Sequence, residues 1–414
     1  MFEESTNLPV AVIGAGPIGL SAAVHLLAQG YTPILFEAGD KAGSNLARWG
    51  HVRMFSPWAY NVDPAAVALL KQKGWNEPAG NEFPTGKELL EQYVTPLASH
   101  CEIAPHLNLN TQVISVSRLN HDVLRTDDRD EVPFVLRVTG PNGDSDVKAQ
   151  AVIDASGTYQ TPNWLGTHGI PALGENAAAD SITYGVPNIL GYDRKQYANQ
   201  SVLVVGGGHS AFNALQDLIL LADQYKDMRV LWGVRNACVA NVVRSPANDE
   251  LQERRRLEVR IQDLLEQGRI EVFNELEIEK INRENGRLIV HSGSRKLPPV
   301  DRIIAATGFR PNLSILAELR ISLDPATQSP TRLAPLIDPN LHSCGSVPEH
   351  GCVELSHPEQ DLYIVGIKSY GRAPTFLLKT GYMQVQSVVN ALATSEISAD
   401  IHPCAAPAIS LCRG

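Results

Sequence analysis

A glycine-rich turn near the N-terminus carries the residues with the clearest chemistry. Residues 10–20 read VAVIGAGPIGL, an apolar strand followed by Gly14, Gly16 and Gly19 at the spacing that lets a backbone approach a pyrophosphate. Glu37 follows a second apolar strand, at the point where a carboxylate accepts hydrogen bonds from a ribose 2′-hydroxyl. These residues predict a dinucleotide held at the N-terminus of a helix.

The same pattern recurs in the middle of the chain. Residues 201–211 read SVLVVGGGHSA, with Gly206, Gly208 and Ala211 at the three critical positions. No acid follows the next apolar strand, and Arg235 stands there instead. A guanidinium binds a 2′-phosphate through paired charge-assisted hydrogen bonds, so the second site is expected to prefer NADPH over NADH.

Each copy ends in a buried strand that emerges in small residues. Residues 151–157 read AVIDASG, and residues 303–312 read IIAATGFRPN. Small residues at these points let the chain return close to a bound dinucleotide. The chain therefore contains one supersecondary sequence twice, and two copies imply two bound nucleotides.

The segments around these motifs are expected to position them. Residues 39–60 are predicted to form a loop over the first ligand, with a surface loop held by a few aromatic side chains as the alternative. Helices are predicted over 63–72 and 85–99, the second with a capping box at its start. The pattern over 111–153 alternates with period two and predicts an antiparallel meander on one face of the sheet.

Two further helices are predicted in the second half of the chain. One spans 249–266, and its basic run is interpreted as a solvated face with intrahelical ion pairs. The other spans 375–393 and follows a strand at 362–366. The positive end of this last helix is expected to face an anionic or electron-rich ligand, with Thr375 near its start.

The composition indicates a soluble globular protein of two or three domains. The chain has 414 residues, of which 43% are hydrophobic and 19% charged, and its net charge of −10 argues against nucleic-acid and anionic-membrane partners. No early segment resembles a signal peptide and no apolar run is long enough to span a membrane, so a cytoplasmic location is expected. Six cysteines are too sparse for a disulfide framework, and none forms a CxxC pair.

On these motifs the chain resembles the flavoproteins with two dinucleotide-binding domains, a superfamily that holds pyridine-nucleotide disulfide reductases and flavin-containing monooxygenases. The resemblance rests on GAGPIG with Glu37, GGGHSA with Arg235, and ATGFRPN, in that order. It implies an α/β fold with two Rossmann-like, three-layer ββα/βαβ dinucleotide-binding domains. Residues 1–165 and a C-terminal return, 309–414, would form an FAD domain that includes the meander, and residues 166–308 would form an NADPH domain.

The resemblance also assigns residues to the two cofactors. Those that carry over to FAD are Gly14, Gly16, Gly19 and Glu37, and those that carry over to NADPH are Gly206, Gly208, Ser210 and Arg235. The further candidates for cofactor binding are Pro17, Ala38, Arg48, Trp49, Val113, Ala155, Ser156, Gly157, His209, Thr307, Gly308, Gly366 and Thr375.

The absence of a dithiol decides between branches of the superfamily. A disulfide reductase needs a CxxC or CxxxxC pair beside the flavin, and the chain has neither. A reduced flavin without a dithiol gives its electrons to a bound acceptor or to oxygen. The chain therefore resembles the NADPH-dependent monooxygenases, in which reduced FAD and O₂ form a C4a-hydroperoxide that transfers one oxygen to a soft nucleophile.

Two departures from that branch leave other functions open. The FxGxxxHxxxW signature is missing, with residues 166–168 as its nearest fragment, and the loop 43–49 lacks the usual paired glycine before tryptophan. One alternative is an NADPH-dependent reductase that passes electrons to a quinone, a metal ion or a partner protein. Another is a flavin- and NADP-binding redox sensor without turnover. For the monooxygenase, the expected partners are a small-molecule substrate and O₂, with no resident metal and no prediction of oligomeric state.

The prediction of a substrate depends on Cys344 and Cys352, which lie just before the last strand. Thiolates are soft ligands that bind trivalent arsenic, and the combination resembles bacterial flavin monooxygenases that oxidise trivalent organoarsenicals. The alternative role of a single cysteine is that of a buried small hydrophobe. The flavin itself would carry the chemistry, and the candidate catalytic side chains are His350, Lys368, Tyr370 and Arg372, whose alternative roles are structural.

Overall fold

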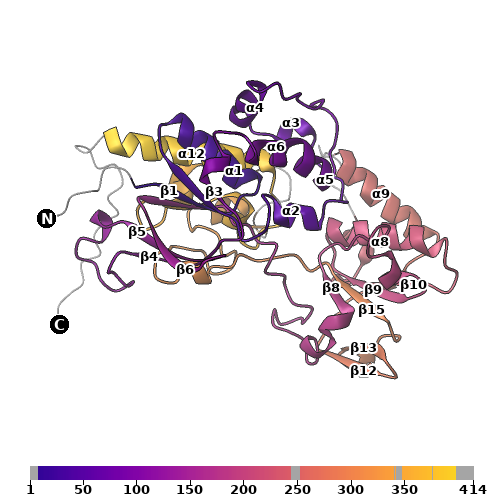
Figure 1. Cartoon of the computed structure of the whole chain (residues 1–414). Helices are drawn as coiled ribbons and strands as arrows, with labels where there is room; N and C mark the ends of the chain where they lie inside the picture. The colour runs from indigo at the N-terminus through magenta and orange to yellow at the C-terminus, as the bar shows by residue number, and fades with distance from the viewer. Residues whose placement is uncertain (1–7, 244–251, 340, 342–346, 375, 398–414) are drawn as a thin grey trace, which may run out of the picture.

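The computed structural model describes residues 8–243, 252–339, 341, 347–374 and 376–397. Two α/β units lie side by side, each built on its own parallel sheet (Figure 1). The first unit contains the N-terminal part of the chain and the C-terminal return, and the second unit contains the middle of the chain. The fold therefore has the two-unit organisation that the duplicated motif predicts.

Five parallel strands form the sheet of the first unit, in the order β16-β7-β1-β2-β3. The central strand β1 reads VAVI and is buried along its whole length, because both faces of a parallel sheet are covered. The five strands are β1 (Val10–Ile13), β2 (Pro33–Phe36), β3 (Leu107–Asn108), β7 (Ala151–Asp154) and β16 (Leu362–Ile364).

Helices cover one face of this sheet, and an antiparallel meander covers the other. The long helices α1 (Pro17–Ala28) and α12 (Leu378–Ile397) pack against each other on the helical face. The meander consists of β4 (Gln112–Arg118), β5 (Phe134–Gly140) and β6 (Gly143–Ala149), which confirms the prediction for that segment. Alternate side chains of β1 and of the meander share one buried core.

The second unit repeats this arrangement. Its parallel sheet has the order β11-β10-β9-β15-β8. Helices α8 (His209–Ala222) and α9 (Gln252–Glu266) cover one face, and a small antiparallel sheet covers the other. Two units of one design confirm the predicted α/β fold. The strands are β8 (Ile182–Tyr184), β9 (Ser201–Val205), β10 (Arg229–Gly233), β11 (Glu271–Phe273), β12 (Lys280–Glu284), β13 (Arg287–Ser292), β14 (Arg295–Lys296) and β15 (Arg302–Ala305).

An insertion of short helices lies between β2 and β3. The helix predicted from residue 63 is confirmed as α4, where the Asp63 carboxylate accepts a hydrogen bond from Ala65 N at 2.9 Å. The helix predicted from Thr85 begins with its capping box but then makes a π-helical turn, because Pro96 has no N–H for the α-helical pattern. The elements are α2 (Ser44–Arg48), α3 (Trp58–Asn61), α4 (Pro64–Lys71), α5 (Gly86–Leu89), η1 (Leu90–Val94) and α6 (Thr95–Ala98).

Three sequence-based boundaries need correction. The segment 39–60 is not one irregular loop, because α2 buries Leu46 and α3 buries Trp58 in the core of the first unit. The last helix begins at Leu378, and Thr375 lies outside the described residues. Strand β8 is an element for which the sequence patterns described above give no prediction. The remaining elements are η2 (Ala104–His106), η3 (Arg129–Glu131), η4 (Asn176–Ser181), α7 (Arg194–Tyr197), η5 (Val239–Asn241), η6 (Ser314–Leu316), α10 (Ala334–Ile337), α11 (Cys352–Leu355) and η7 (Gly366–Tyr370).

The chain passes between the units along two segments that lie side by side. Asn163 N donates a hydrogen bond to Gly308 O at 2.9 Å, and the rings of Tyr159 and Phe309 stack with centroids 4.7 Å apart. The domain boundaries expected near residues 165 and 308 stay predictions. Within the described ranges, no helix combines the length and apolarity that a bilayer crossing needs.

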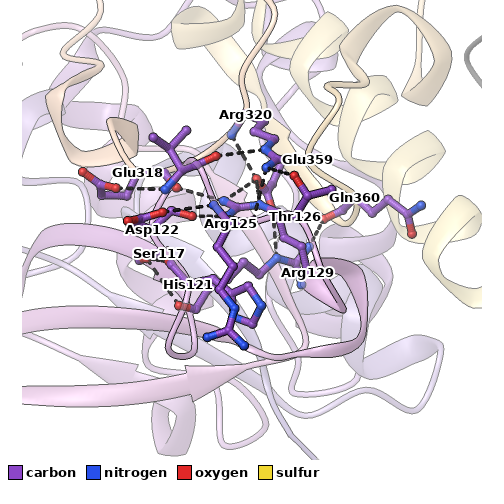
Figure 2. Close-up of polar contacts among 12 residues, drawn as sticks. Ser117, His121, Asp122, Arg125, Thr126, Arg129, Glu318, Arg320, Glu359 and Gln360 are labelled. Carbon is purple, nitrogen blue, oxygen red and sulfur yellow. Dashed lines mark hydrogen bonds and ion pairs between the residues drawn. The ribbon is translucent and has the colours of Figure 1, made fainter. Parts of the chain in front are cut away.

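A buried polar network fixes the C-terminal return to the meander (Figure 2). The fully buried Glu359 carboxylate accepts hydrogen bonds from Arg118 Nε at 2.8 Å, Arg129 Nη2 at 2.9 Å and Arg320 N at 2.9 Å. Burial raises the pKa of Glu359, but these hydrogen bonds outweigh burial and hold the pKa below its ordinary value. The network therefore anchors the chain directly before β16 enters the first sheet.

Candidate functional site

The first glycine turn is closed against strand β7. Gly14, just beyond β1, has φ +96°, and a Cβ there would lie 2.8 Å from Ala155 O. A Cβ on Gly19 would lie 1.9 Å from Gly14 O. Only glycine allows both this left-handed conformation and these close backbone approaches. The two outer glycines of the motif therefore have structural roles.

The start of helix α1 faces open space. Within the described structure, a Cβ on Gly16 would meet no atom within 4 Å. The N-cap is Gly16 itself, without a capping side-chain bond, and the first turn holds Pro17 but no acid. The first amide groups of α1 are therefore available to an anion, and the helix dipole favours one there. This cradle fits a pyrophosphate.

Glu37 closes the same turn from the end of β2. Its carboxylate accepts hydrogen bonds from Ala15 N at 3.0 Å and from Gly39 N at 2.9 Å, which fix its orientation. Each carboxylate oxygen keeps another lone pair, so the group can still accept a hydrogen bond from a ribose hydroxyl. Ala38 lies exposed beside it.

The second glycine turn has the same construction. Gly206 has φ +136°, and a Cβ there would lie 2.3 Å from Ala306 O at the end of β15. A Cβ on Gly208 would meet no described atom within 4 Å, and no side-chain cap or acid occupies the first turn of α8. Ala211 takes the third position and is fully buried. Ser210 lies exposed in the first turn of the helix. A second pyrophosphate therefore fits here.

Arg235 lies exposed just beyond β10, where the first unit has Glu37 beyond β2. At the base of this turn, His209 is held between two aromatic rings, with centroid distances of 5.0 Å to Phe55 and 5.3 Å to Phe212. His209 Nε2 also lies 2.8 Å from Glu258 Oε1 on α9. Phe55 belongs to the first unit, so the two units meet at the second glycine turn.

Residues 49–58 provide more than one of these contacts between the units. His51 makes a hydrogen bond to the backbone of Pro187 in the second unit, and burial lowers the pKa of His51. Its Nε2 atom is buried and has no hydrogen-bond partner in the described structure. The segment predicted to cover the first ligand therefore also packs against the second unit.

A buried ion pair lies behind the first turn. Lys368 Nζ on η7 is 2.6 Å from Asp154 Oδ2 and 3.0 Å from Ser156 Oγ, and both charged side chains are at most 1% exposed. Ser156 Oγ donates in turn to Asp154 Oδ1 at 2.6 Å. Lys368 is one of the candidate catalytic side chains, with a structural role as the alternative. In the structure its ammonium joins the ends of β7 and β16.

His350 and Tyr370 are also buried. Gln384 Oε1 accepts a hydrogen bond from Gly366 N at 2.8 Å, so its Nε2 points to His350 Nε2 at 3.0 Å. His350 Nδ1 then donates to Pro348 O at 2.9 Å, which assigns the neutral Nδ1–H tautomer and uses both ring nitrogens. Burial raises the pKa of the Tyr370 phenol. The Tyr370 phenol also hydrogen-bonds the Thr380 side chain, so the polar atoms of both side chains contact other protein groups in this structure.

The remaining candidates divide by location. Gly366 has φ +69° and a Cβ there would lie 3.3 Å from the Ile18 side chain, so the end of β16 reaches the first turn. Arg48 and Arg372 are exposed. The candidates gathered at the first turn are Gly14, Gly16, Pro17, Gly19, Glu37, Ala155, Ser156, Gly157 and Gly366, and those at the second are Gly206, Gly208, His209, Ser210 and Arg235.

Two candidates lie apart from both turns, and two more follow Ala306, whose carbonyl closes the second turn. Val113 is buried in the core between the meander and the first sheet. Trp49 packs over Gly86, where a Cβ would lie 2.9 Å from the indole ring. Thr307 and Gly308 lie in the segment that joins the units, where Thr307 Oγ1 donates to Asn163 O at 2.5 Å.

The two cysteines of the predicted substrate site are not brought together by any described contact. Cys344 lies outside the described residues, and Cys352 is half-buried at the start of α11 against the core of the first unit. Cys352 N donates to Ser387 Oγ at 3.0 Å. The described residues include no group of three His, Cys, Asp or Glu side chains that could hold a metal ion.

Sequence reasoning assigned no role to Asp154, Gln384 or Phe55. Asp154 had a visible signal, because a carboxylate at the end of the apolar run AVID must find a partner when the strand is buried. Gln384 and Phe55 had none, since their partners are distant in the chain.

Known proteins resemble this chain over different lengths. A flavin-containing monooxygenase, FMO GS-OX-like 7 of Arabidopsis thaliana, is 27% identical over 52% of this chain, and the match spans only 47% of that protein. A ferredoxin–NADP reductase of Frankia alni is 24% identical over 75% of this chain and 78% of its own length. The bacillithiol disulfide reductase Bdr (YpdA) of Bacillus cereus has the same fold, with a TM-score of 0.69 and 18% identity over 94% of this chain and all of its own.

One match covers most of the two units together. The model of the pyridine nucleotide-disulphide oxidoreductase family matches residues 11–332, which include both glycine turns and the strands that close them. This range exceeds half of the chain, and it shows that the chain belongs to the pyridine nucleotide-disulphide oxidoreductase family.

Proposed function

We propose that this chain is an NADPH-dependent flavin monooxygenase that transfers one oxygen atom from O₂ to a soft heteroatom, sulfur or nitrogen, of a small molecule. The observation that carries the proposal is a pair of open glycine turns in one chain whose sequence has no CxxC or CxxxxC pair. With two nucleotides and no dithiol, electrons taken from NADPH leave through a bound acceptor or through oxygen.

The residues of the two turns divide between two cofactors. FAD would lie on the Gly16 end of α1, with Glu37 as the acceptor for its ribose. NADPH would lie on the Gly208 end of α8, with Arg235 beside its 2′-phosphate. When bound, the flavin supplies hydride acceptance and oxygen activation.

The chain's own contribution is to hold the two sites in place. Asp154 and Lys368 fix the ends of β7 and β16 behind the first turn. Phe55 of the first unit packs against His209 at the second turn. The ion pair would support the first nucleotide site from within its own unit, and the Phe55–His209 contact would keep the second site next to the first unit, as transfer between two bound cofactors requires.

The organoarsenical substrate stays a prediction from the sequence. It depends on Cys344 and Cys352 acting together as soft ligands. Cys352 packs against the core of the first unit, and Cys344 lies outside the described residues. We therefore propose the broader class of soft heteroatoms and treat trivalent arsenic as one member to be assayed.

The test measures oxygen uptake and NADPH oxidation in the same assay. Purified protein is loaded with FAD, and oxygen uptake is measured with NADPH and a sulfide such as thioanisole or a tertiary amine such as N,N-dimethylaniline. We expect a substrate to accelerate NADPH oxidation and oxygen uptake in a 1:1 ratio, with formation of the sulfoxide or N-oxide. Oxygen uptake that yields only hydrogen peroxide with every probe would contradict the proposal.

A reductase is the second candidate, because the similarity to the ferredoxin–NADP reductase spans 75% of the chain. The same protein is assayed without oxygen, using NADPH and ferredoxin or a quinone. Rapid anaerobic reduction of such an acceptor, without oxygenated product in air, would favour the reductase. A protein that binds both nucleotides but turns over in neither assay would favour the sensor.

A further inference from the structure

A buried glutamine joins the last helix to the end of strand β16. Gln384 on α12 has no exposed surface, and its side-chain amide makes three hydrogen bonds. Oε1 accepts from Gly366 N at 2.8 Å, and Nε2 lies 3.0 Å from both Ser369 Oγ and His350 Nε2. An apolar side chain would pack here without the cost of burying an amide. The contribution of Gln384 therefore lies in the groups that it holds.

The three partners allow only one orientation of the Gln384 amide. The backbone N–H of Gly366 can only donate, so it faces Oε1. Ser369 Oγ gives its own hydrogen to Gly366 O at 2.8 Å, so it accepts from the amide. His350 Nδ1 donates to Pro348 O, so His350 Nε2 accepts as well. The amide is therefore fixed by its surroundings.

This network holds one residue from both sides. Gly366 N is bonded by Gln384, and Gly366 O is bonded by Ser369. Gly366 also has a left-handed φ of +69°. Both polar backbone groups of Gly366 are therefore tied down at the point where the chain leaves β16.

Gly366 lies directly against the start of α1. A Cβ on Gly366 would lie 3.3 Å from the Ile18 side chain, and a Cβ on Gly381 of α12 would lie 2.5 Å from Ile18 Cδ1. Ile18 belongs to the first turn of α1, whose amide groups form the first pyrophosphate cradle. On the other side, a Cβ on Gly157 beyond β7 would lie 3.8 Å from Ile367. The end of β16 therefore reaches from the start of α1 to the end of β7.

The sheet places these groups at its ligand-binding edge. Strands β1, β7 and β16 are parallel neighbours, so their carboxyl ends lie at one edge of the sheet. Ligands of open parallel α/β sheets bind outside that edge. Gly366 therefore belongs to the wall of the first nucleotide site, and Gln384 lies behind it.

We propose that Gln384 is a positioning residue of the first nucleotide site. Its amide holds Gly366, and through Gly366 the end of β16 and the start of α1, in the conformation that binds FAD. Gln384 acts through Gly366 and not by contact with the cofactor. The proposal rests on the assignment of FAD to the first turn under the proposed function, and it does not depend on the reaction with oxygen.

The test compares two substitutions of Gln384. Gln384→Met keeps an unbranched side chain of similar size but removes the hydrogen bonds to Gly366 N and to its other partners. Titration of the full-length apoprotein with FAD should show a dissociation constant raised about tenfold, the loss expected for one hydrogen bond. The visible circular dichroism of the bound flavin should change as well. Gln384→Glu keeps an acceptor for Gly366 N, because its other oxygen can share a proton with His350, and it should recover most of the affinity.

Ser387→Ala is the matched control on the same helix. Ser387 Oγ accepts a hydrogen bond from Cys352 N at 3.0 Å, one turn away from Gln384. Its removal should lower the unfolding temperature of the apoprotein but leave FAD affinity and the flavin spectrum unchanged. Equal losses of FAD affinity in Gln384→Met and Ser387→Ala, or no recovery in Gln384→Glu, would overturn the proposal.

A milder variant covers the case in which Gln384→Met does not fold. Ser369→Ala releases only Gly366 O and leaves Gly366 N bonded to Gln384. We expect a smaller loss of FAD affinity with the same change in the flavin spectrum. Unchanged affinity and an unchanged spectrum in folded Ser369→Ala would overturn the proposal.

The outcomes separate this proposal from the monooxygenase. Weaker FAD binding in Gln384→Met, in a protein that oxygenates no sulfide or amine, supports the positioning role and removes only the function. Oxygenation by the unmodified protein, with normal FAD affinity in Gln384→Met, supports the function and overturns the positioning role.

Discussion

The two glycine turns share a backbone but differ in the side chains that close them. Gly14 and Gly206 both have positive φ, and each lies against the carbonyl of a returning strand. Gly16 and Gly208 both open toward free space at a helix start. Duplication of the backbone therefore accounts for two phosphate sites, and the differences must come from elsewhere in the chain.

Those differences lie behind and beside the turns. The first turn has Glu37 bonded to the amides of Ala15 and Gly39, and the Asp154–Lys368 pair behind it. The second unit has apolar residues at the end of β15 and an exposed Arg235. The carboxylates at the first turn are therefore fixed by contacts within the protein, whereas the guanidinium at the second turn is exposed.

The largest expected effect comes from breaking the buried Asp154–Lys368 ion pair of the first unit. Asp154→Asn leaves the Lys368 ammonium buried at 1% exposure without a counter-charge. Loss of one partner from a buried pair costs about 3–5 kcal/mol. We expect the free energy of unfolding to fall by this amount in urea titrations that follow unfolding by flavin release.

A control and a rescue test this explanation. Asp146→Asn removes an exposed partner of Arg137 and should change stability little. Asp154→Leu combined with Lys368→Met removes both charges and should recover much of the loss. If the double variant is no more stable than Asp154→Asn, the unpaired charge is not the cause.

The next largest effect distinguishes Gly14, whose role is structural, from Gly16, which faces the proposed ligand. Gly14→Ala forces a Cβ to 2.8 Å from Ala155 O at φ +96° and should cost about 1–3 kcal/mol without any cofactor. Gly16→Ala meets no described atom, so the apoprotein should keep its stability while FAD binding weakens. Thermal unfolding with and without FAD measures both. Equal loss of apoprotein stability in the two variants would show that Gly16 does not face the ligand.

Local patterns were enough to predict both turns. A strand, a glycine turn, a helix and a second strand follow one another within about 30 residues, so their pairing is encoded in adjacent segments. The meander has the same advantage, because β5 and β6 are joined by a tight turn. The parallel sheets of the two units follow from these local elements.

Pairing over long distances was not predictable from local patterns. Asp154 and Lys368 are 214 residues apart, and Glu359 is 241 residues from Arg118. No spacing rule connects such positions in a single sequence. The candidate site was therefore predicted at its glycines, while the surroundings of Lys368 and His350 required the structure.

Short elements inside polar segments were missed for a related reason. Strand β8 has three residues and is fixed by pairing with β15 rather than by its own pattern. Helices α2 and α3 are held by burial of Leu46 and Trp58. Tertiary contacts, rather than intrinsic propensity, decide such short elements.

The difference between Glu37 and Arg235 gives the third prediction. Arg235→Ala should raise the Michaelis constant for NADPH about tenfold or more and leave that for NADH nearly unchanged, because only NADPH carries the 2′-phosphate. Steady-state NAD(P)H oxidation measures both constants. Equal changes for the two coenzymes would show that Arg235 does not contact the 2′-phosphate.

The smallest expected effect contrasts one buried titratable group in each unit. Burial raises the pKa of Asp217 on α8 to about 6 and lowers the pKa of His357 in the first unit to about 4. The contribution of Asp217 to the stability of the fold is fully present below its ordinary pKa of 3.8 and is lost as the pH rises through 6. The contribution of His357 is present above its ordinary pKa of 6.5 and is lost as the pH falls toward 4. Asp217→Asn should stabilise the second unit at pH 8 by on the order of 1 kcal/mol, a value reduced for partial exposure, and by about half as much at pH 5, because the penalty accumulates between pH 3.8 and pH 6. His357→Gln should show its gain at pH 5 and none at pH 8. Urea unfolding at both pH values decides, and an equal gain from either variant at pH 5 and pH 8 would rule out titration as the cause.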